Sequence, residues 1–138
     1  MSTIFFDIAM SLYSSLNTID NVTPIDWENS PYLPTIGVTY LKQSHIPNET
    51  VQVTAGSAGS DLYSGIYHVA VNVESGRGIV EAMVLADKIA TKFKRGSNHS
   101  SNGVIVNISS VTIGNSSSID GWYIVPVEIR YRSFNKAR

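Results

Sequence analysis

The sequence predicts an α+β fold, in which a mostly antiparallel or mixed sheet of four to five strands carries two helices on one face. Two segments repeat apolar residues with the 3.6-residue period of a helix, and at least four others alternate apolar and polar residues as strands do. The 138 residues suffice to bury one good core but not two. We therefore expect a single domain over residues 1–138, in the order helix, two or three strands, helix, two strands.

The first predicted helix begins at a cap on Ser2 or Thr3 and ends near Leu16. Its broad apolar face comprises Ile4, Phe5, Ile8, Ala9, Leu12 and Leu16, and its polar side comprises Asp7, Ser11, Ser14 and Ser15. A second apolar stripe comprises Phe6, Met10 and Tyr13. That stripe is either the margin of a wide core contact or a contact with another subunit, because the helix is apolar over more than half of its circumference.

The predicted strands of the first half cover residues 25–28, 35–43, 51–54 and 62–74. In the segment 35–43, alternation places Ile36, Val38 and Tyr40 on one side. In the segment 62–74, it places Tyr67, Val69, Val71 and Val73 on the core side. Between these strands, residues 44–61 include a glycine- and serine-rich stretch, and we expect them to form a flexible segment.

The second predicted helix spans residues 78–93 and directs seven apolar residues towards the core: Ile79, Ala82, Met83, Ala86, Ile89, Ala90 and Phe93. Val84 and Leu85 lie on or beside the polar arc of this helix. Apolar residues in that position are a mild indication of a contact surface.

Two further strands are predicted after a loop over residues 94–103. The first begins at Val104, and its apolar phase changes near Ser109 and Ser110, which predicts a bulge there. The second covers residues 122–132, after a turn at 115–121, and turns Arg130 and Arg132 away from the core. Because Pro126 has no N–H to donate, we expect this last strand to lie at a sheet edge or to be bulged.

Composition and motifs exclude most chemistry. The chain has no cysteine, which excludes disulfides, thiolate zinc sites and thiol nucleophiles. Its three histidines lie far apart without metal-ligand spacing, and no nucleophile-elbow motif occurs, so we expect no enzyme activity, cofactor or metal. We also expect no secretory signal and no membrane helix, because the N-terminus lacks a positive region and no apolar run approaches about 20 residues.

The net charge of −1 hides an asymmetry between the two halves of the chain. Residues 1–69 carry one base and six acids, a charge of −5, whereas residues 70–138 carry nine bases and five acids, a charge of +4. This is either chance with a basic C-terminal end, or an arrangement that suits head-to-tail packing of acidic and basic surfaces. A near-neutral total argues against a self-standing reader of nucleic acid.

Several segments taken in order resemble a known family. Trp27-Glu28-Asn29 resembles a short motif that precedes the family's second strand, and Ile36-Gly37-Val38-Thr39 and Gly65-Ile66-Tyr67-His68-Val69 follow in order. The end of the chain, Trp122-Tyr123-Ile124-Val125-Pro126-Val127-Glu128-Ile129-Arg130-Tyr131, matches best. By this order and spacing the chain is similar to the tail terminator, or tail-completion, proteins of long-tailed, non-contractile bacteriophages.

The resemblance implies a structural role in the virion, without catalysis or cofactor. Such proteins form a homo-hexameric ring on the head-proximal end of the tail tube. The ring ends tube polymerisation and offers the surface on which the head docks. The implied partners are other copies of the chain, the tail tube protein and a head-completion or stopper protein, with genomic DNA only as passing cargo. Assembly would take place in the host cytoplasm.

Within that role we expect subunit or partner contacts at Phe6, Met10, Tyr13, Leu85, Arg130 and Arg132. The first three have core packing as their alternative, and the two arginines have a solvated strand face. We also expect the stretch Ala55–Ser60 to order on the tail tube. Three other functions stay open: another neck component, such as a stopper or head–tail connector, a small nucleic-acid-binding accessory protein, and a small enzyme or ligand-binding domain.

Overall fold

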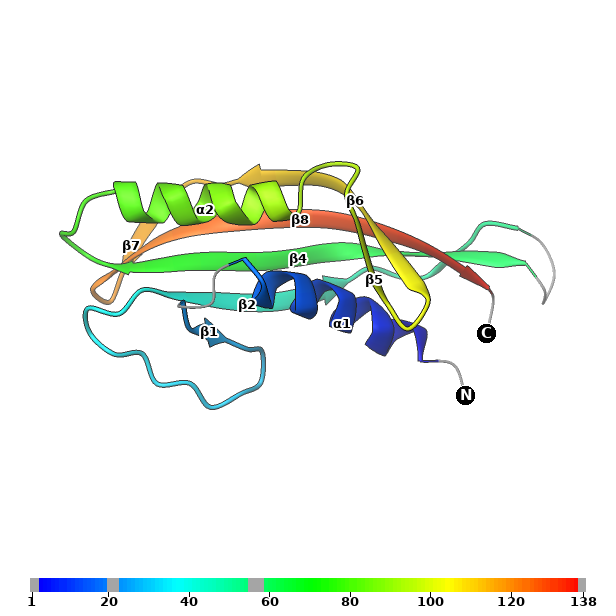
Figure 1. Cartoon of the computed structure of the whole chain (residues 1–138), viewed down its shortest axis with the longest axis horizontal. Coiled ribbons are helices and arrows are strands. Elements are labelled where there is room, and N and C mark those ends of the chain that lie inside the picture. Colours follow the sequence, from blue (N-terminus) through cyan, green and yellow to red (C-terminus); the bar gives the residue numbers. More distant parts are fainter. Residues whose placement is uncertain (1–2, 20–22, 55–58, 137–138) are drawn as a thin grey trace.

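A computed structural model describes residues 3–19, 23–54 and 59–136. Its elements are α1 (Ile4–Asn17), β1 (Ile25–Asp26), β2 (Tyr40–Pro47), β3 (Val51–Gln52), β4 (Ser60–Glu74), α2 (Val80–Lys92), β5 (Asn98–Ser101), β6 (Val104–Ile113), β7 (Ser117–Ile119) and β8 (Trp122–Lys136). All strands join one sheet with the order β1-β2-β4-β8-β6-β5, to which β3 adds beside β4 and β7 beside β8 (Figure 1). Among the described residues, β1–β2 is the one parallel pair.

The expected sheet of four to five strands is wrong, because the sheet has eight strands and curls into a half-barrel. β1 and β3 lie within the predicted segments 25–28 and 51–54, and the two strands that were not predicted are short, with four residues in β5 and three in β7. Such segments are too brief to show an alternation in the sequence. β5 lies in the expected loop 94–103 and β7 in the expected turn 115–121, where pairing with longer neighbours makes them strands.

β8 lies in the middle of the sheet and pairs with β4 in unbroken register at Pro126, so the expectation of an edge or of a bulge there is also wrong. It pairs with β4 over fifteen residues on one side, and with β6 and β7 on the other. Pro126 is accommodated where β6 ends and β7 has not begun, and its carbonyl accepts the Gly114 N–H there at 2.8 Å. N–H and C=O of one strand residue point to the same side, so the missing donor of Pro126 faces this gap. The predicted bulge in β6 is confirmed between Ile108 and Ser110.

Side chains from both helices meet one face of the sheet in a single core. On β4 the predicted core side is confirmed, since Tyr67, Val69, Val71 and Val73 are all fully buried. The facing residues of β8 and β6 join them, as do Ile8, Leu12 and Leu16 of α1 and Ala82, Leu85, Ala86, Ile89 and Phe93 of α2. Among the described residues, neither helix is long and apolar enough to cross a membrane.

β2 begins and ends later than the predicted strand 35–43. Residues 27–39 form a loop instead, and the core side of β2 carries Leu41 and Gln43 rather than Tyr40. Residues 44–61, for which we expect flexibility, include the end of β2, all of β3 and the start of β4, whereas 55–58 lie outside the described residues. β3 and the ends of β4 and β8 extend past the helices as an arm, defined here as residues 51–54, 59–64 and 132–136 (Figure 1).

Candidate interaction surfaces

α1 exposes phenylalanine and buries polar groups. Phe6 is 60% exposed and Phe5 is also exposed, whereas Asp7 is only 4% exposed and Ser11 is fully buried. The expected polar side of the helix is covered except at Ser14, because the β5–β6 hairpin packs there: Ser15 Oγ lies 2.6 Å from His99 Nδ1, and Asn102 reaches Asp7. The buried Asp7 carboxylate also accepts the Thr3 hydroxyl at 2.8 Å. Apolar surface is therefore left open at the start of α1.

The stripe of Phe6, Met10 and Tyr13 continues this open surface along α1. Met10 and Tyr13 are half-buried, and both line a shallow cavity of about 240 Å³ with Ser14, Asn17 and Trp27. The rings of Tyr13 and Trp27 are 5.3 Å apart. Burial, reinforced by the charge of Glu28, raises the pKa of the Tyr13 hydroxyl. The stripe is thus a partly open surface of two aromatic side chains and one methionine.

α2 is turned differently from the expected arc. Leu85 is 6% exposed and belongs to the core, whereas Ile79 and Met83, expected in the core, are exposed together with Val80 and Val84. Val80 and Val84 lie among the polar residues of the helix and its apolar arc is wide, so the period alone could not decide which part of that arc faces the sheet. Of the exposed group, sequence reasoning identified Val84 and missed the other three.

A groove of about 660 Å³ separates the end of α1 from α2. It is lined by Thr18, Ile19, Val84, Asp87, Lys88, Thr91 and Lys92, and we call it the α1–α2 groove.

The loop over residues 27–39, called the Leu33 loop, carries the two most exposed large apolar side chains among the described residues. Leu33 is 89% and Ile36 is 84% exposed. Sequence reasoning placed Ile36 in a strand and did not consider Leu33. The sequence did indicate a loop here, because the prolines at 31 and 34 disfavour a strand and flank Leu33.

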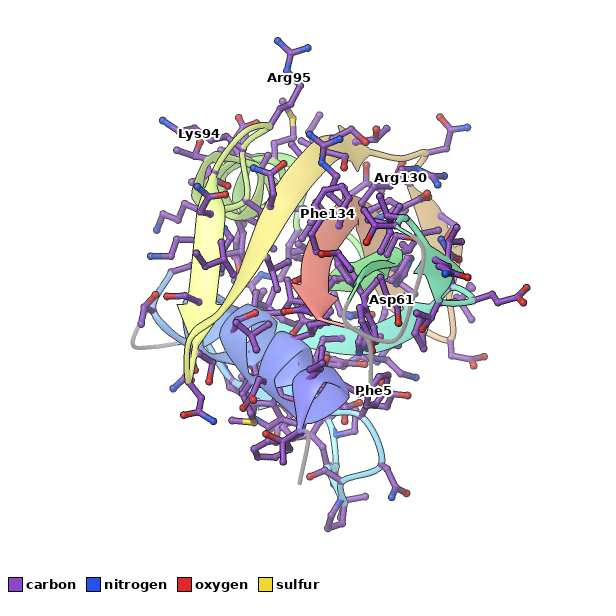
Figure 2. The ribbon with its side chains drawn as sticks, turned by 90° about the vertical axis from the view of Figure 1, so that its right-hand side faces the viewer. Phe5, Asp61, Lys94, Arg95, Arg130 and Phe134 are labelled. Atoms are coloured by element: carbon purple, nitrogen blue, oxygen red, sulfur yellow. The ribbon has the colours of Figure 1, made fainter. Side chains whose placement is uncertain are left out.

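Arg130 and Arg132 lie on the sheet face opposite the helices. Arg130 Nη2 contacts Glu128 Oε1 at 2.6 Å in an exposed ion pair. Further along β8, the exposed Phe134 lies across from Leu62 on the arm (Figure 2). The six expected contact residues thus fall into three places: the α1 stripe, the core for Leu85, and the outer sheet face for the arginines.

A polar cluster joins the start of the Leu33 loop, β2 and β8 under α1. Glu28 Oε1 accepts the His45 backbone N–H at 2.8 Å, His45 Nε2 hydrogen-bonds the Tyr131 hydroxyl, and the Phe5 ring stacks on His45 at 5.6 Å. Burial lowers the pKa of His45, and the Glu28 carboxylate offsets this only in part. The described residues include no group of three acidic or histidine side chains that could hold a metal ion. The cluster organises the sheet edge, since Glu28 satisfies a backbone donor that a neighbouring strand would otherwise use.

Comparisons with known proteins agree with this picture. A family model described as phage tail terminator protein matches residues 7–131. A solved structure without a functional description aligns over 93% of this chain and 89% of its own, with a TM-score of 0.67 and 22% identity. A chain from the virion of a native gene transfer agent particle aligns over 98% of this chain and 100% of its own, with a TM-score of 0.62 and 13% identity. No curated protein matches the chain.

At such identities the two structural likenesses concern the fold alone. The family match covers most of the chain, including both helices and the sheet from β1 to the middle of β8. The chain therefore belongs to the phage tail terminator protein family, whose members are structural, non-catalytic proteins of the bacteriophage tail.

Proposed function

We propose that this chain forms a homo-hexameric ring at the head-proximal end of the tail tube, where it ends tube polymerisation and provides the surface for head docking. The single observation that carries the proposal is the family match over residues 7–131. In this role the ring touches the tail tube protein on one side and a head-completion or stopper protein on the other. Genomic DNA passes through its hole without being read.

The exposed apolar residues support an assembled state. A closed ring needs two different patches on each subunit that meet head to tail. The chain offers unlike patches on separate elements, the stripe of Phe6, Met10 and Tyr13 and the exposed arc of Val80, Met83 and Val84. Contiguous apolar surface of this kind marks contact sites on soluble chains. The fold shared with a virion chain of a gene transfer agent is consistent with this role.

Not all expected contact residues act in the same way in this proposal. Phe6, Met10 and Tyr13 are assigned to a contact with a neighbouring chain. Arg130 and Arg132 are assigned to acidic groups of a neighbour or of the tube. Leu85 supports the α2 surface from the core side and touches no partner. The expected ordering of Ala55–Ser60 on the tube concerns a stretch of which 55–58 lie outside the described residues.

The ring is tested by native mass spectrometry over a concentration series, alone and with purified tail tubes, and by negative-stain imaging of the largest species. A six-fold particle with a central hole supports the proposal. A largest species of two or three chains in both conditions contradicts it. The phenotype without the chain then separates the neck proteins, because over-long tails mark a terminator and full-length free tails with leaking heads mark a stopper. DNA binding that falls steeply with salt would instead indicate a nucleic-acid-binding protein.

A further inference from the structure

We propose that the Leu33 loop of one copy inserts Leu33 and Ile36 into the α1–α2 groove of a second copy. The inference rests on the proposed ring and adds the Leu33 loop and the α1–α2 groove to the contacts between its subunits. It follows from these two side chains, called the anchors, and from the rigidity of the loop, the shape of the groove and the charges around both.

The anchors are unusual among the exposed apolar residues of the chain. A single exposed aliphatic side chain is ordinary on a protein surface. Leu33 and Ile36, however, are more exposed than any other large apolar side chain among the described residues, and they lie three positions apart on one loop. They contribute almost nothing to the core of their own chain. If a partner covers these two side chains, nearly all of their apolar surface is therefore newly removed from water.

The loop that carries the anchors is held in place at several points. Ser30 N–H donates to the Trp27 carbonyl at 3.2 Å and Val38 N–H to the Thr35 carbonyl at 3.0 Å, so a turn closes each end. The rings of Tyr32 and Tyr40 are 5.1 Å apart. A loop already fixed in its bound shape loses less conformational entropy on binding.

Arg77, three residues before α2, and Glu81 in the first turn of α2 secure the end of this loop. Arg77 Nη1 donates to the Gly37 carbonyl at 2.8 Å, and the Thr39 hydroxyl donates to Glu81. Gly37 has a φ of +86°, a conformation that glycine adopts without strain. The anchors thus project from a fixed base.

The α1–α2 groove has the size and walls to receive them. Its volume of about 660 Å³ lies in the range of pockets that enclose small ligands, about 300–1,000 Å³. Ile19 and Val84 supply apolar wall, and the stems of Lys88 and Lys92 extend it because lysine packs its methylene groups on apolar surface. Two aliphatic side chains fit this chemistry better than a charged ligand would.

Charge favours a second copy of the chain as the occupant. The base of the Leu33 loop is acidic, with Asp26 and Glu28 at its start and the Glu74 carboxylate beside Gly37. The rim of the groove carries two lysines and one aspartate. The contact therefore brings the three carboxylates at the base of one chain's loop, which outnumber Arg77 there, to the net-positive rim of another chain's groove. Charge complementarity of this kind orients partners.

The two surfaces are different ones, although they lie near each other in one chain. Figure 1 shows the loop between β1 and β2 projecting from the sheet below α1, and its last residue, Thr39, hydrogen-bonds Glu81 in the first turn of α2. A contact between different surfaces is heterologous, and it closes into a ring when the rotation between copies allows it.

The absence of cysteine from the sequence makes the contact directly testable. Ile36→Cys on a chain with one tag is mixed with Val84→Cys on a chain with another tag, and the mixture is oxidised mildly. A disulfide forms only where Cα atoms come within about 7 Å. We expect a disulfide between differently tagged chains in several-fold higher yield than in the matched mixture of Ile36→Cys with Val51→Cys, another exposed aliphatic position.

Native mass spectra of the same variants separate this inference from the proposed ring. Rings without the Ile36–Val84 link overturn the contact and leave the proposed function standing. Chains that neither link nor assemble overturn both. A double variant that links only within one chain shows that the loop folds onto its own groove, which also overturns the contact. As a second measure, Leu33→Ser with Ile36→Ser should raise the dissociation constant between subunits roughly a hundredfold, and an unchanged constant contradicts the inference.

Discussion

Gly65 is the position where a single methyl group should destabilise the fold most clearly. It pairs with Pro47 on β2 and with Tyr131 on β8, at the point where the arm leaves the main sheet. A Cβ at this position would lie 2.6 Å from the Ile46 carbonyl oxygen, 2.7 Å from the Tyr131 hydroxyl and 2.9 Å from Pro47 Cα. Two of these atoms belong to the backbone of a paired strand, so they cannot move without disturbing the β2–β4 ladder.

The expected magnitude follows from two opposing effects of Gly65→Ala. Alanine in a strand is ordinarily more favourable than glycine by roughly 0.5–1 kcal/mol. Overpacking a closed site costs about 1–3 kcal/mol, and backbone neighbours place this site at the upper end. We therefore expect the free energy of unfolding to fall by about 2 kcal/mol. For a domain of this length, that lowers Tm by roughly 6–10 °C.

Urea unfolding followed by circular dichroism measures the effect, with Gly114→Ala as the matched control. At Gly114 the nearest atom to a built Cβ is a Pro126 side-chain carbon at 3.1 Å, and the next is 3.7 Å away. The control should therefore change the free energy of unfolding by less than about 1 kcal/mol. If Gly65→Ala unfolds at the wild-type urea concentration with an unchanged m-value, the close approach of β2 to Gly65 is refuted.

Three further predictions concern buried polar groups and the outer sheet face. Tyr67→Phe should raise the free energy of unfolding by about 1 kcal/mol, because the Tyr67 hydroxyl is buried and has no hydrogen-bond partner among the described residues; a clear loss of stability would reveal a partner. The pKa of His45 is lowered below 6.5 in the folded chain. The contribution of neutral His45 to the free energy of unfolding is therefore fully present above pH 6.5 and is lost as the pH falls through the folded pKa. We expect the free energy of unfolding to be lower at about pH 5.5 than at about pH 7.5, and His45→Gln to make this difference smaller. An equal difference in the variant would show that His45 is not its source. Arg130→Glu with Arg132→Glu should reduce ring formation while changing monomer stability by less than about 1 kcal/mol, because the Arg130–Glu128 pair is exposed; unchanged assembly at moderate salt removes both arginines from the interface.

The long elements could be predicted from the sequence because their periods are long and regular. Residues of β4 alternate from Tyr67 to Val73 without interruption, and the structure buries each expected one. The change of phase in β6 was equally readable, and the bulge lies there. In both cases one residue in two must face the core, so the pattern determines the side.

The remaining errors came from features that depend on tertiary contacts. β5 has four residues and is a strand only because β6 pairs with it. The same hairpin covers Asp7 and Ser11, which inverts the polar and exposed sides of α1 near its start. α2 has apolar residues on two arcs, and only its fit to β4 and β8 selects the one that contains Leu85.

The contact residues were the least predictable part. Phe6 was identified because a second apolar stripe is visible in the helical period. Leu33 was missed because a lone leucine in a proline-rich loop has no period, and its exposure appears only once the loop has a shape. A sequence pattern can show which face packs on the core, but it cannot show how far a loop projects from it.

The length of the tails made without this chain tests the central claim most directly. A phage with a stop codon at Trp27 is grown in a host that does not suppress it, and its tails are measured by electron microscopy. We predict tubes that are longer and more variable than wild-type tails and that carry no heads, with normal length restored when the intact chain is supplied in trans. Tails of normal length and narrow distribution in the absence of the chain would contradict its role as the terminator.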